Sequence, residues 1–380
     1  MNPFVYGEVT PVSAFVDREE ELDRLAADLA AGQKVFLISP RRFGKSSLIR
    51  QAMRALERRS ILTVEVTVSS YSSYVAFLEG YARALVASET RLDRMTAWLK
   101  ELFTVVRPEV RLQGDTAGRG RLAIAFPSIR GARDEARLAE EVFSLPARIA
   151  ASRGRRLAVA LDEFQAIGSF DGGSVEHALR AAVQQQREVG YVFAGSEPAL
   201  MERMLGRQRP FYKAGPVMRL DRIPADRFAE FVDGRFRRTG LKPEPGLGAA
   251  VVELAGNMPY DVQRLAHEAW DDARAAGRKT VTLEHLHATL KRLLGEYETI
   301  FERTWLSLTL PQRAALRAVV VEDGRELLSA DARARHRLGG ASTVQSSLAA
   351  LVKHEILMRE PDRYVVIDSL MREWVARRTF

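Results

Sequence analysis

Short apolar segments alternate with segments of helical periodicity along the first part of the chain. Continuous apolar runs predict buried parallel strands at residues 35–38, 157–161 and 191–194. Alternating apolar and polar positions predict another strand at 61–68, and a short final strand is expected at 219–221. Helical spacing separates these runs, at 17–29, after Ser46, and at 74–86, 133–150 and 174–188. This succession predicts an α/β domain over residues 1–222, with a parallel sheet flanked by helices.

Two short alternating runs interrupt this pattern, at 110–113 and 121–124, with a glycine-bearing turn between them. They predict a β-hairpin inserted at about 107–128. Beyond residue 222 the pattern is helical, first in a helix that contains Phe228 and Phe231 and then at 246–254, 261–275 and 283–293, with a turn expected at 256–260. Residues 223–300 are therefore predicted to form a small all-helical lid.

The last segment, residues 301–380, has a different pattern. Helices are expected at 311–321 and 329–337, and Ser342 is expected to cap a third helix that continues to 352. Two strand-like runs follow at 356–359 and 363–367 and predict a hairpin. Helices followed by a two-stranded wing indicate a winged helix.

Composition places the chain among ordinary globular proteins, with 46% hydrophobic and 28% charged residues. The longest apolar runs are strand-sized and the N-terminus lacks signal-peptide features, so we expect a cytoplasmic protein without a membrane segment. The absence of cysteine excludes disulfides and thiolate zinc sites. A net charge of +8 and a pI near 9.8 fit an acidic partner such as nucleic acid, and fit an arginine-rich proteome equally well.

The residues after the first apolar run predict a phosphate-binding loop. They match the pattern G-x-x-x-x-G-K-[ST], except that Ser39 replaces the first glycine. In such a loop, backbone N–H groups and the helix N-terminus attract an anion, Lys45 reaches the β- and γ-phosphates, and the Ser46 hydroxyl binds Mg²⁺. The nucleotide-binding residues predicted here are Ser39, Pro40, Arg41, Arg42, Phe43, Gly44, Lys45, Ser46 and Ser47. The preceding helix, expected to be capped by Asp17, can form a wall of the adenine pocket with Phe15, Val16 and Arg18.

Two carboxylates end the apolar run at 157–161. At the carboxyl end of a buried parallel strand, Asp162 would hold the Mg²⁺ shell and Glu163 would orient or deprotonate the attacking water. Ser196 ends the run that begins at residue 191, where a polar group would sense the γ-phosphate. The alternatives are a solvated turn at the carboxylates and a simple turn serine at 196.

Three further positions are candidates for nucleotide contacts. Arg209, or its neighbour Arg207, could reach a nucleotide across the boundary of a homo-oligomer as an arginine finger. In the lid, the turn at Pro259 could lie against the base, and Arg264 could act as a second sensor. Exposed structural arginines remain the alternative for each of these cations.

The winged helix offers a candidate DNA surface. The recognition helix would present Thr343, Gln345 and Ser346 to base edges, and Arg337 and Lys353 to phosphates. Residues 306–380 contain 12 Lys/Arg and 9 Asp/Glu, a balance of only +3. Winged helices also serve as rigid packing modules, so both interpretations stay open.

Taken together, these residues resemble the archaeal-type ATPases of the STAND/AAA+ group, which are similar in layout to origin-recognition ATPases. The resemblance rests on residues 15–22, 39–48, 161–165, 195–196, 256–260 and 364–374. It implies a P-loop AAA+-like sheet with a helical lid and a C-terminal winged helix. It also implies binding of ATP or ADP with Mg²⁺, slow hydrolysis, and movement of the lid and winged helix with nucleotide state.

The expected function is an ATP-binding, weakly hydrolysing switch that couples nucleotide state to double-stranded DNA or a DNA-bound partner through the winged helix. The competing expectation is a signalling or defence ATPase that acts through a protein partner and does not bind DNA.

Overall fold

The computed structural model describes residues 1–7, 18–87, 109–114, 120–125, 131–170, 174–360 and 362–378. The chain forms two compact units. One unit comprises Pro11–Asp221, and the other comprises Met1–Thr10 together with Arg222–Phe380.

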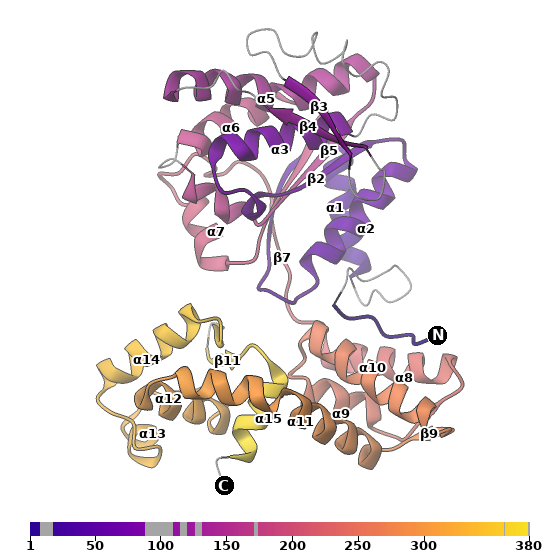
Figure 1. The fold of residues 1–380 in the computed structure, drawn as a ribbon, viewed down its shortest axis with the longest axis vertical. Coiled ribbons are helices and arrows are strands. Elements are labelled where there is room, and N and C mark those ends of the chain that lie inside the picture. Colours follow the sequence, from indigo (N-terminus) through magenta and orange to yellow (C-terminus); the bar gives the residue numbers. More distant parts are fainter. Residues whose placement is uncertain are drawn as a thin grey trace. The chain divides into compact units, whose positions relative to one another are not determined.

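A five-stranded parallel sheet forms the centre of the first unit (Figure 1). Its strands are β1 (Lys34–Ile38), β2 (Leu62–Thr67), β5 (Leu157–Asp162), β6 (Val189–Gly195) and β7 (Val217–Arg219). They lie in the order β2-β5-β6-β1-β7, and all neighbouring pairs are parallel. The predicted parallel sheet is therefore confirmed, and its last strand lies two residues earlier than 219–221.

Helices cover both faces of this sheet. They are α1 (Glu19–Ala30), α2 (Lys45–Arg58), α3 (Tyr74–Ala87), α5 (Ala132–Arg153), α6 (Ser174–Gln185) and α7 (Pro198–Met204), with the 3₁₀ turns η2 (Val68–Ser70) and η3 (Phe164–Ser169). Along β1, Phe36 and Ile38 join the core that includes α3, α5 and α6, whereas Val35 and Leu37 join the core that includes α1 and α2. This alternation explains why a fully buried strand reads as a continuous apolar run.

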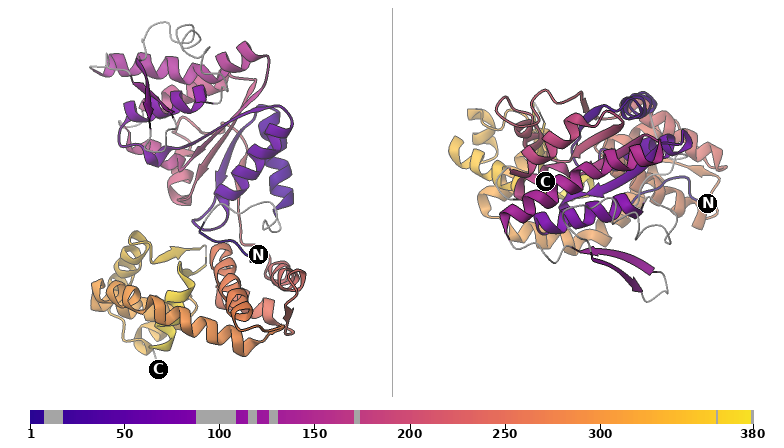
Figure 2. Two further views of the ribbon diagram at one scale, coloured as in Figure 1. Left: turned by 45° about the vertical axis from the view of Figure 1, so that its right-hand side comes forward. Right: turned by 90° about the horizontal axis from the view of Figure 1, so that it is seen from above.

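The predicted hairpin is present as β3 (Glu109–Gly114) and β4 (Gly120–Ala125). The two strands pair antiparallel over their whole length and form a sheet of their own. Figure 2 shows this hairpin standing apart from the five-stranded sheet.

The second unit begins with α8 (Ala225–Arg238), α9 (Leu247–Leu254), α10 (Pro259–Ala275) and α11 (Leu283–Ser307). It is not all helical, because β8 (Lys242–Pro243) pairs in parallel with β9 (Thr280–Val281). The predicted turn at 256–260 is shorter, since Pro259 already occupies the first turn of α10. Helix α11 continues through position 300, where a boundary between lid and winged helix was expected.

The C-terminal part contains α12 (Leu310–Val321), α13 (Ala330–Arg335), α14 (Ala341–Lys353), β10 (Leu357–Arg359), β11 (Tyr364–Val366) and α15 (Ser369–Arg377). The antiparallel β10–β11 pair is the predicted wing. The predicted cap at Ser342 is wrong, because α14 already begins at Ala341 and Gly340, two residues before Ser342, occupies the N-cap without a side-chain hydrogen bond. Helix α15 was not predicted; the Asp368 side chain caps it by accepting from the N–H groups of Leu370 and Met371.

Residues 1–7 pack on the second unit, although they were predicted to open the ATPase domain. Phe4 is buried, with its ring centroid 5.0 Å from that of Phe236 on α8. The Tyr6 hydroxyl donates to Glu268 on α10 at 2.7 Å. No helix within the described part of the chain is long and apolar enough to cross a membrane.

Candidate functional site

The phosphate loop joins the carboxyl end of β1 to the start of α2. Ser39 is fully buried, and its backbone N–H donates to the carbonyl of Gly195 on β6 at 3.2 Å. Its hydroxyl donates to the Pro40 carbonyl at 3.0 Å. A small side chain with a local acceptor therefore occupies the position of the first glycine without disturbing the sheet edge.

Gly44 turns the chain into α2. It occupies the N-cap with φ 88°, a left-handed conformation that strongly favours glycine. No side chain caps this helix, so its first N–H groups, together with the helix dipole, offer positive potential to an anion. Of the loop side chains, Phe43 is buried, whereas Arg41 and Arg42 are exposed.

The predicted cation and the predicted carboxylates meet beside this helix start. The Lys45 ammonium forms an ion pair with the Asp162 carboxylate and lies 3.1 Å from Glu163 Oε1. The Ser46 hydroxyl donates to Asp162 Oδ2 at 3.0 Å. Asp162 ends β5, and Lys45 and Ser46 begin the helix that follows β1 and its loop. The groups therefore meet at the carboxyl edge of the sheet, where α/β sheets place ligand sites.

Glu163 is fixed by more than one neighbour. Its Oε2 accepts from the Ser196 hydroxyl at 2.5 Å and from Gln165 Nε2 at 2.6 Å. Burial acts to raise the pKa of Glu163, but the hydrogen bond from Ser196, the charge of Lys45 and the hydrogen bond from Gln165 outweigh it and lower the pKa below its ordinary value. The carboxylate is therefore ionised at neutral pH.

The oxygen pair of Ser46 and Asp162 suits Mg²⁺. This ion prefers hard oxygen ligands and usually takes one or two carboxylates together with substrate phosphates and water. Within the described ranges, no three His, Cys, Asp or Glu side chains cluster into a metal cage. The donor set thus fits a metal ion that arrives with a nucleotide.

Comparison with known proteins decides the family. Residues 15–265 match the model described as "ATPase domain predominantly from Archaea", and residues 299–377 match a "Probable winged helix domain". The chain belongs to this archaeal-type ATPase family. Membership implies nucleotide binding. A comparison with curated proteins gave no match.

Several solved structures share the fold of nearly the whole chain. The Walker-type ATPase of Pyrococcus abyssi aligns with a TM-score of 0.63 at 18% identity, over 97% of this chain and 99% of that one. The Aeropyrum pernix ORC1 protein, solved in complex with DNA, aligns with a TM-score of 0.52 at 14% identity, over 96% and 93% of the two chains. The ORC2 protein of Aeropyrum pernix, in its ADPNP–ADP complexes, aligns with a TM-score of 0.53 at 12% identity, over 98% of this chain and 95% of that one. These likenesses establish the fold.

The predicted residues before the loop are only partly described in this ATPase. Phe15, Val16 and Asp17 lie outside the described residues. Arg18, and not Asp17, occupies the N-cap of α1. Its guanidinium is buried, pairs with Glu21 at 2.6 Å and donates to the carbonyl of Asp221.

Two predicted arginines have acidic partners inside their own unit. Arg209 pairs with Glu176, a fully buried carboxylate on α6. Arg264 is buried, and its guanidinium lies 3.0 Å from the Asp261 carboxylate and 3.5 Å from the Asp368 carboxylate. Its guanidinium also lies 5.6 and 5.7 Å from the ring centroids of Tyr260 and Tyr297. The finger and second-sensor roles stay predictions, and each would require the arginine to exchange these partners for phosphate.

The predicted recognition helix, α14, exposes the expected side chains. Val344, Ser347, Leu348 and Leu351 face its core. The exposed positions include Thr343, Gln345, Ser346, Lys353 and, before the helix, Arg337. They are accessible to a ligand, and DNA contact through them stays a prediction.

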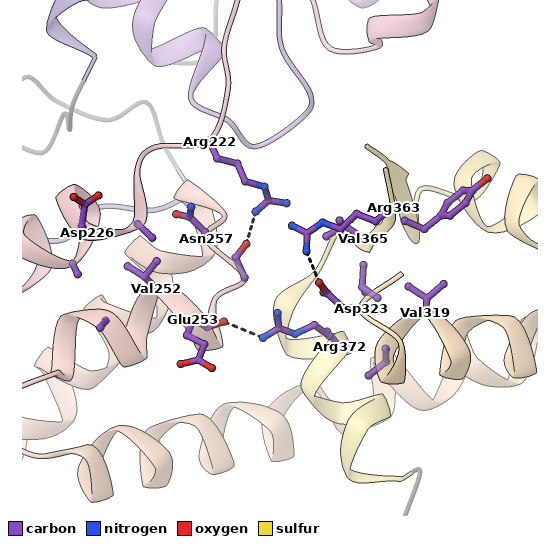
Figure 3. A pocket seen from close by; sticks show the side chains of 17 residues that line it. Arg222, Asp226, Val252, Glu253, Asn257, Val319, Asp323, Arg363, Val365 and Arg372 are labelled. Atoms are coloured by element: carbon purple, nitrogen blue, oxygen red, sulfur yellow. Dashed lines mark hydrogen bonds and ion pairs between the residues drawn. The ribbon is translucent and has the colours of Figure 1, made fainter. Parts of the chain in front are cut away.

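A second feature, missed from the sequence, is a cavity of about 410 Å³ within the second unit (Figure 3). It lies among α8, α9, α12, β11 and α15, and the side chains of three arginines line it. Arg222 donates to the Gly256 carbonyl, Arg372 to that of Glu253 at 3.1 Å, and Arg363 to the Asp323 carboxylate at 2.8 Å. The arrangement joins the lid part of this unit to the winged-helix part.

The turn of the wing is tied to the same network. Glu360 Oε1 accepts from Arg222 at 2.6 Å, and its Oε2 accepts from Arg363 at 2.9 Å. Asp362 pairs with Arg325 at 2.8 Å. No motif marks Arg222 or Glu360 in the sequence, whereas Gln165 had a signal, since it follows the carboxylate pair at a spacing of two residues from Glu163.

Proposed function

We propose that this protein is an ATP-dependent molecular switch. It binds ATP with Mg²⁺, hydrolyses it slowly, and couples the nucleotide state to engagement of double-stranded DNA, or a DNA-bound partner, by its winged helix. The observation that carries the proposal is the meeting of Lys45, Ser46, Asp162 and Glu163 at the carboxyl edge of the sheet.

The chemistry assigned to these residues is electrostatic and positional. On nucleotide binding, Lys45 would exchange its carboxylate partners for the β- and γ-phosphates and offset charge that develops on the γ-phosphoryl group. Ser46 and Asp162 would hold Mg²⁺, which supplies further positive charge to the phosphates. Glu163 would orient the attacking water and accept its proton, and its lowered pKa keeps it in the basic form.

Chain connectivity supports a coupling route. Strand β7 pairs with β1 at Leu37↔Met218, and β1 leads directly into the phosphate loop. Three residues after the end of β7 the chain reaches Arg222, whose side chain donates to both the Gly256 carbonyl and the wing residue Glu360. A shift of β7 with nucleotide state would therefore be transmitted to the lid turn and the wing through one side chain.

The exposed polar side chains of α14 support the DNA part of the proposal. Thr343, Gln345 and Ser346 offer short hydrogen-bonding groups at the start of the helix, and Arg337 and Lys353 offer positive charge. The whole chain carries a net charge of +8. In a homo-oligomer, Arg209 would act on the nucleotide of a neighbouring copy.

One observation favours the second candidate, a signalling or defence ATPase that binds a protein partner. The wing turn carries two carboxylates, Glu360 and Asp362, and both are held in ion pairs. Because these ion pairs tie the wing turn to arginines of its own unit, the wing is better suited to an internal contact than to a DNA groove.

Phosphate release and ATP binding test the enzymatic part. Lys45→Ala should abolish ATP binding, and Glu163→Gln should bind ATP but hydrolyse it at least roughly a hundredfold more slowly, the scale of a lost general base. Arg50→Ala is the matched control, since Arg50 lies on the same helix in an exposed pair with Glu65. Unchanged ATP affinity in Lys45→Ala would refute the site, and a wild-type rate in Glu163→Gln would remove that residue from its role.

A further inference from the structure

Gln165 is a buried polar residue that the proposed mechanism has not used. It lies in η3, two residues after Glu163, and is only 9% exposed. Its Nε2 donates to Glu163 Oε2 at 2.6 Å and lies 3.3 Å from the Ser196 hydroxyl oxygen. Since Ser196 also donates to Glu163 Oε2, the three side chains form a closed hydrogen-bonded triangle.

The two oxygens of Glu163 therefore have different surroundings. Oε2 is held by two neutral donors that belong to the protein. Oε1 lies 3.1 Å from the Lys45 ammonium, a group expected to turn to the phosphates when ATP binds. Departure of Lys45 would free Oε1 and leave Oε2 held.

The hydrogen bonds of Gln165 fix the orientation of its side-chain amide. A reversed amide would direct its oxygen at the Glu163 carboxylate, so Nε2 must face that carboxylate. In consequence Gln165 Oε1 is buried and has no hydrogen-bond partner among the described residues. A buried unpaired acceptor is destabilising, and its presence indicates that the donor contact on the other side has a use.

The backbone of β6 makes room for this side chain. At Gly195, a Cβ would lie 2.8 Å from Gln165 Oε1 and 2.4 Å from the side chain of Met201. Any larger residue at 195 would push the glutamine away from Glu163 or displace Met201. The strand that supplies Ser196 is therefore shaped to accept Gln165 as well.

We propose that Gln165 is a positioning residue for ATP hydrolysis. It holds Oε2 of Glu163 together with Ser196, so that Oε1 points to the attacking water once Lys45 has turned to the phosphates. The inference rests on the proposed ATPase function and adds a residue to it.

Gln165→Met separates this role from simple packing, because methionine has nearly the same length and shape but cannot donate. Since misplacement of a catalytic group by about 1 Å can cost up to roughly a hundredfold in rate, we expect kcat to fall about ten- to a hundredfold. KM for ATP and the ATP dissociation constant should stay within about twofold of wild type. Folding stability should be unchanged or higher, because the unpaired acceptor is removed as well.

Gln186→Met is the matched control. Gln186 is also a buried glutamine of the first unit, but it donates to the Phe143 carbonyl and accepts from Tyr191, away from Glu163. This change should lower stability and leave kcat near wild type. Gln165→Glu is the second variant should Gln165→Met not fold, because it keeps the shape of the side chain and replaces the donor by an acceptor. It should lower kcat at least as much as Gln165→Met.

The results separate the two levels of the proposal. If the wild-type protein hydrolyses ATP and the folded Gln165 variants keep a wild-type kcat, the positioning role is refuted while the ATPase function stands. A KM that rises in parallel with the loss of kcat would also refute it, since that pattern indicates a damaged binding site. If the wild-type protein releases no phosphate from ATP with Mg²⁺, with or without DNA, both proposals fail.

Discussion

Replacing Lys45 by methionine should destabilise the nucleotide-free protein as well as abolish nucleotide binding. Without ligand, the ammonium lies between two carboxylates, those of Asp162 and Glu163. The Lys45 side chain is 6% exposed and the carboxylates 19% and 25%. Methionine preserves most of the buried stem but leaves two negative charges close together without their cation.

The size of the effect follows from this partial burial. Breaking a fully buried pair costs about 3–5 kcal/mol, whereas exposed pairs contribute below about 1 kcal/mol. The intermediate exposure here places the loss at about 2 kcal/mol. For a unit of this size that corresponds to a fall of about 4–8 °C in the melting temperature. A second substitution, Glu163→Gln, removes one of the two stranded charges and should restore part of the loss.

Calorimetry without nucleotide or Mg²⁺ measures this stability. Arg50→Met is the control, because its partner Glu65 lies 3.7 Å away and both side chains are exposed, and it should change stability by less than about 0.5 kcal/mol. ATP at about a hundred times its dissociation constant should stabilise the wild type by about 2.7 kcal/mol and the Lys45 variant not at all. A Lys45→Met protein as stable as wild type, or one still stabilised by ATP, would refute the reasoning.

Two further predictions concern the second unit. Arg222→Ala should destabilise this unit by about 1–3 kcal/mol, since Glu360 loses a charged hydrogen-bond donor. A double-mutant cycle with Glu360→Gln should give a coupling free energy above about 0.5 kcal/mol. Additive effects of the two substitutions would show that the pair is not coupled. Tyr6→Phe should cost about 1 kcal/mol at neutral pH. Burial and the hydrogen bond to Glu268 raise the pKa of Tyr6 to about 12, so its contribution is present below pH 10 and lost as the pH rises towards 12. The difference between the wild type and Tyr6→Phe should therefore narrow over that range in urea titrations followed by fluorescence, and a constant difference would contradict the assignment.

The sequence was most informative where a local pattern has a single physical cause. Continuous apolar runs identified the buried strands, because a parallel strand is covered on both faces. The Gly44-Lys45-Ser46 step identified the helix start, since only glycine adopts the left-handed turn there easily. The carboxyl ends of the strands then placed Asp162, Glu163 and Ser196 together.

Elements that depend on contacts between distant residues were missed. The β8–β9 pair is two residues long in each strand, too short to show a period. Helix α15 depends on a cap by Asp368, which also contacts Arg264 more than a hundred residues away. The Arg222–Glu360 contact spans 138 positions, and no local pattern could indicate it.

The N-cap of α14 shows a limit of a different kind. Ser342 is a good capping residue by type, but the helix begins at Ala341 after two glycines. Capping preferences amount to about 1 kcal/mol, which the packing of Val344, Leu348 and Leu351 can override.

The central claim, that nucleotide state controls DNA engagement, is tested most directly by fluorescence anisotropy with a labelled DNA duplex at low salt. The DNA affinity of the Glu163→Gln protein with ATP bound should differ at least about tenfold, or by about 1.4 kcal/mol, from the DNA affinity of the wild-type protein with ADP bound. Lys353→Ala should weaken binding and reduce the salt dependence by about one ion, whereas Lys291→Ala, an exposed lysine on α11, should not. Absent binding in both states, or equal affinities with no effect of Lys353→Ala, would contradict the claim and favour a protein partner.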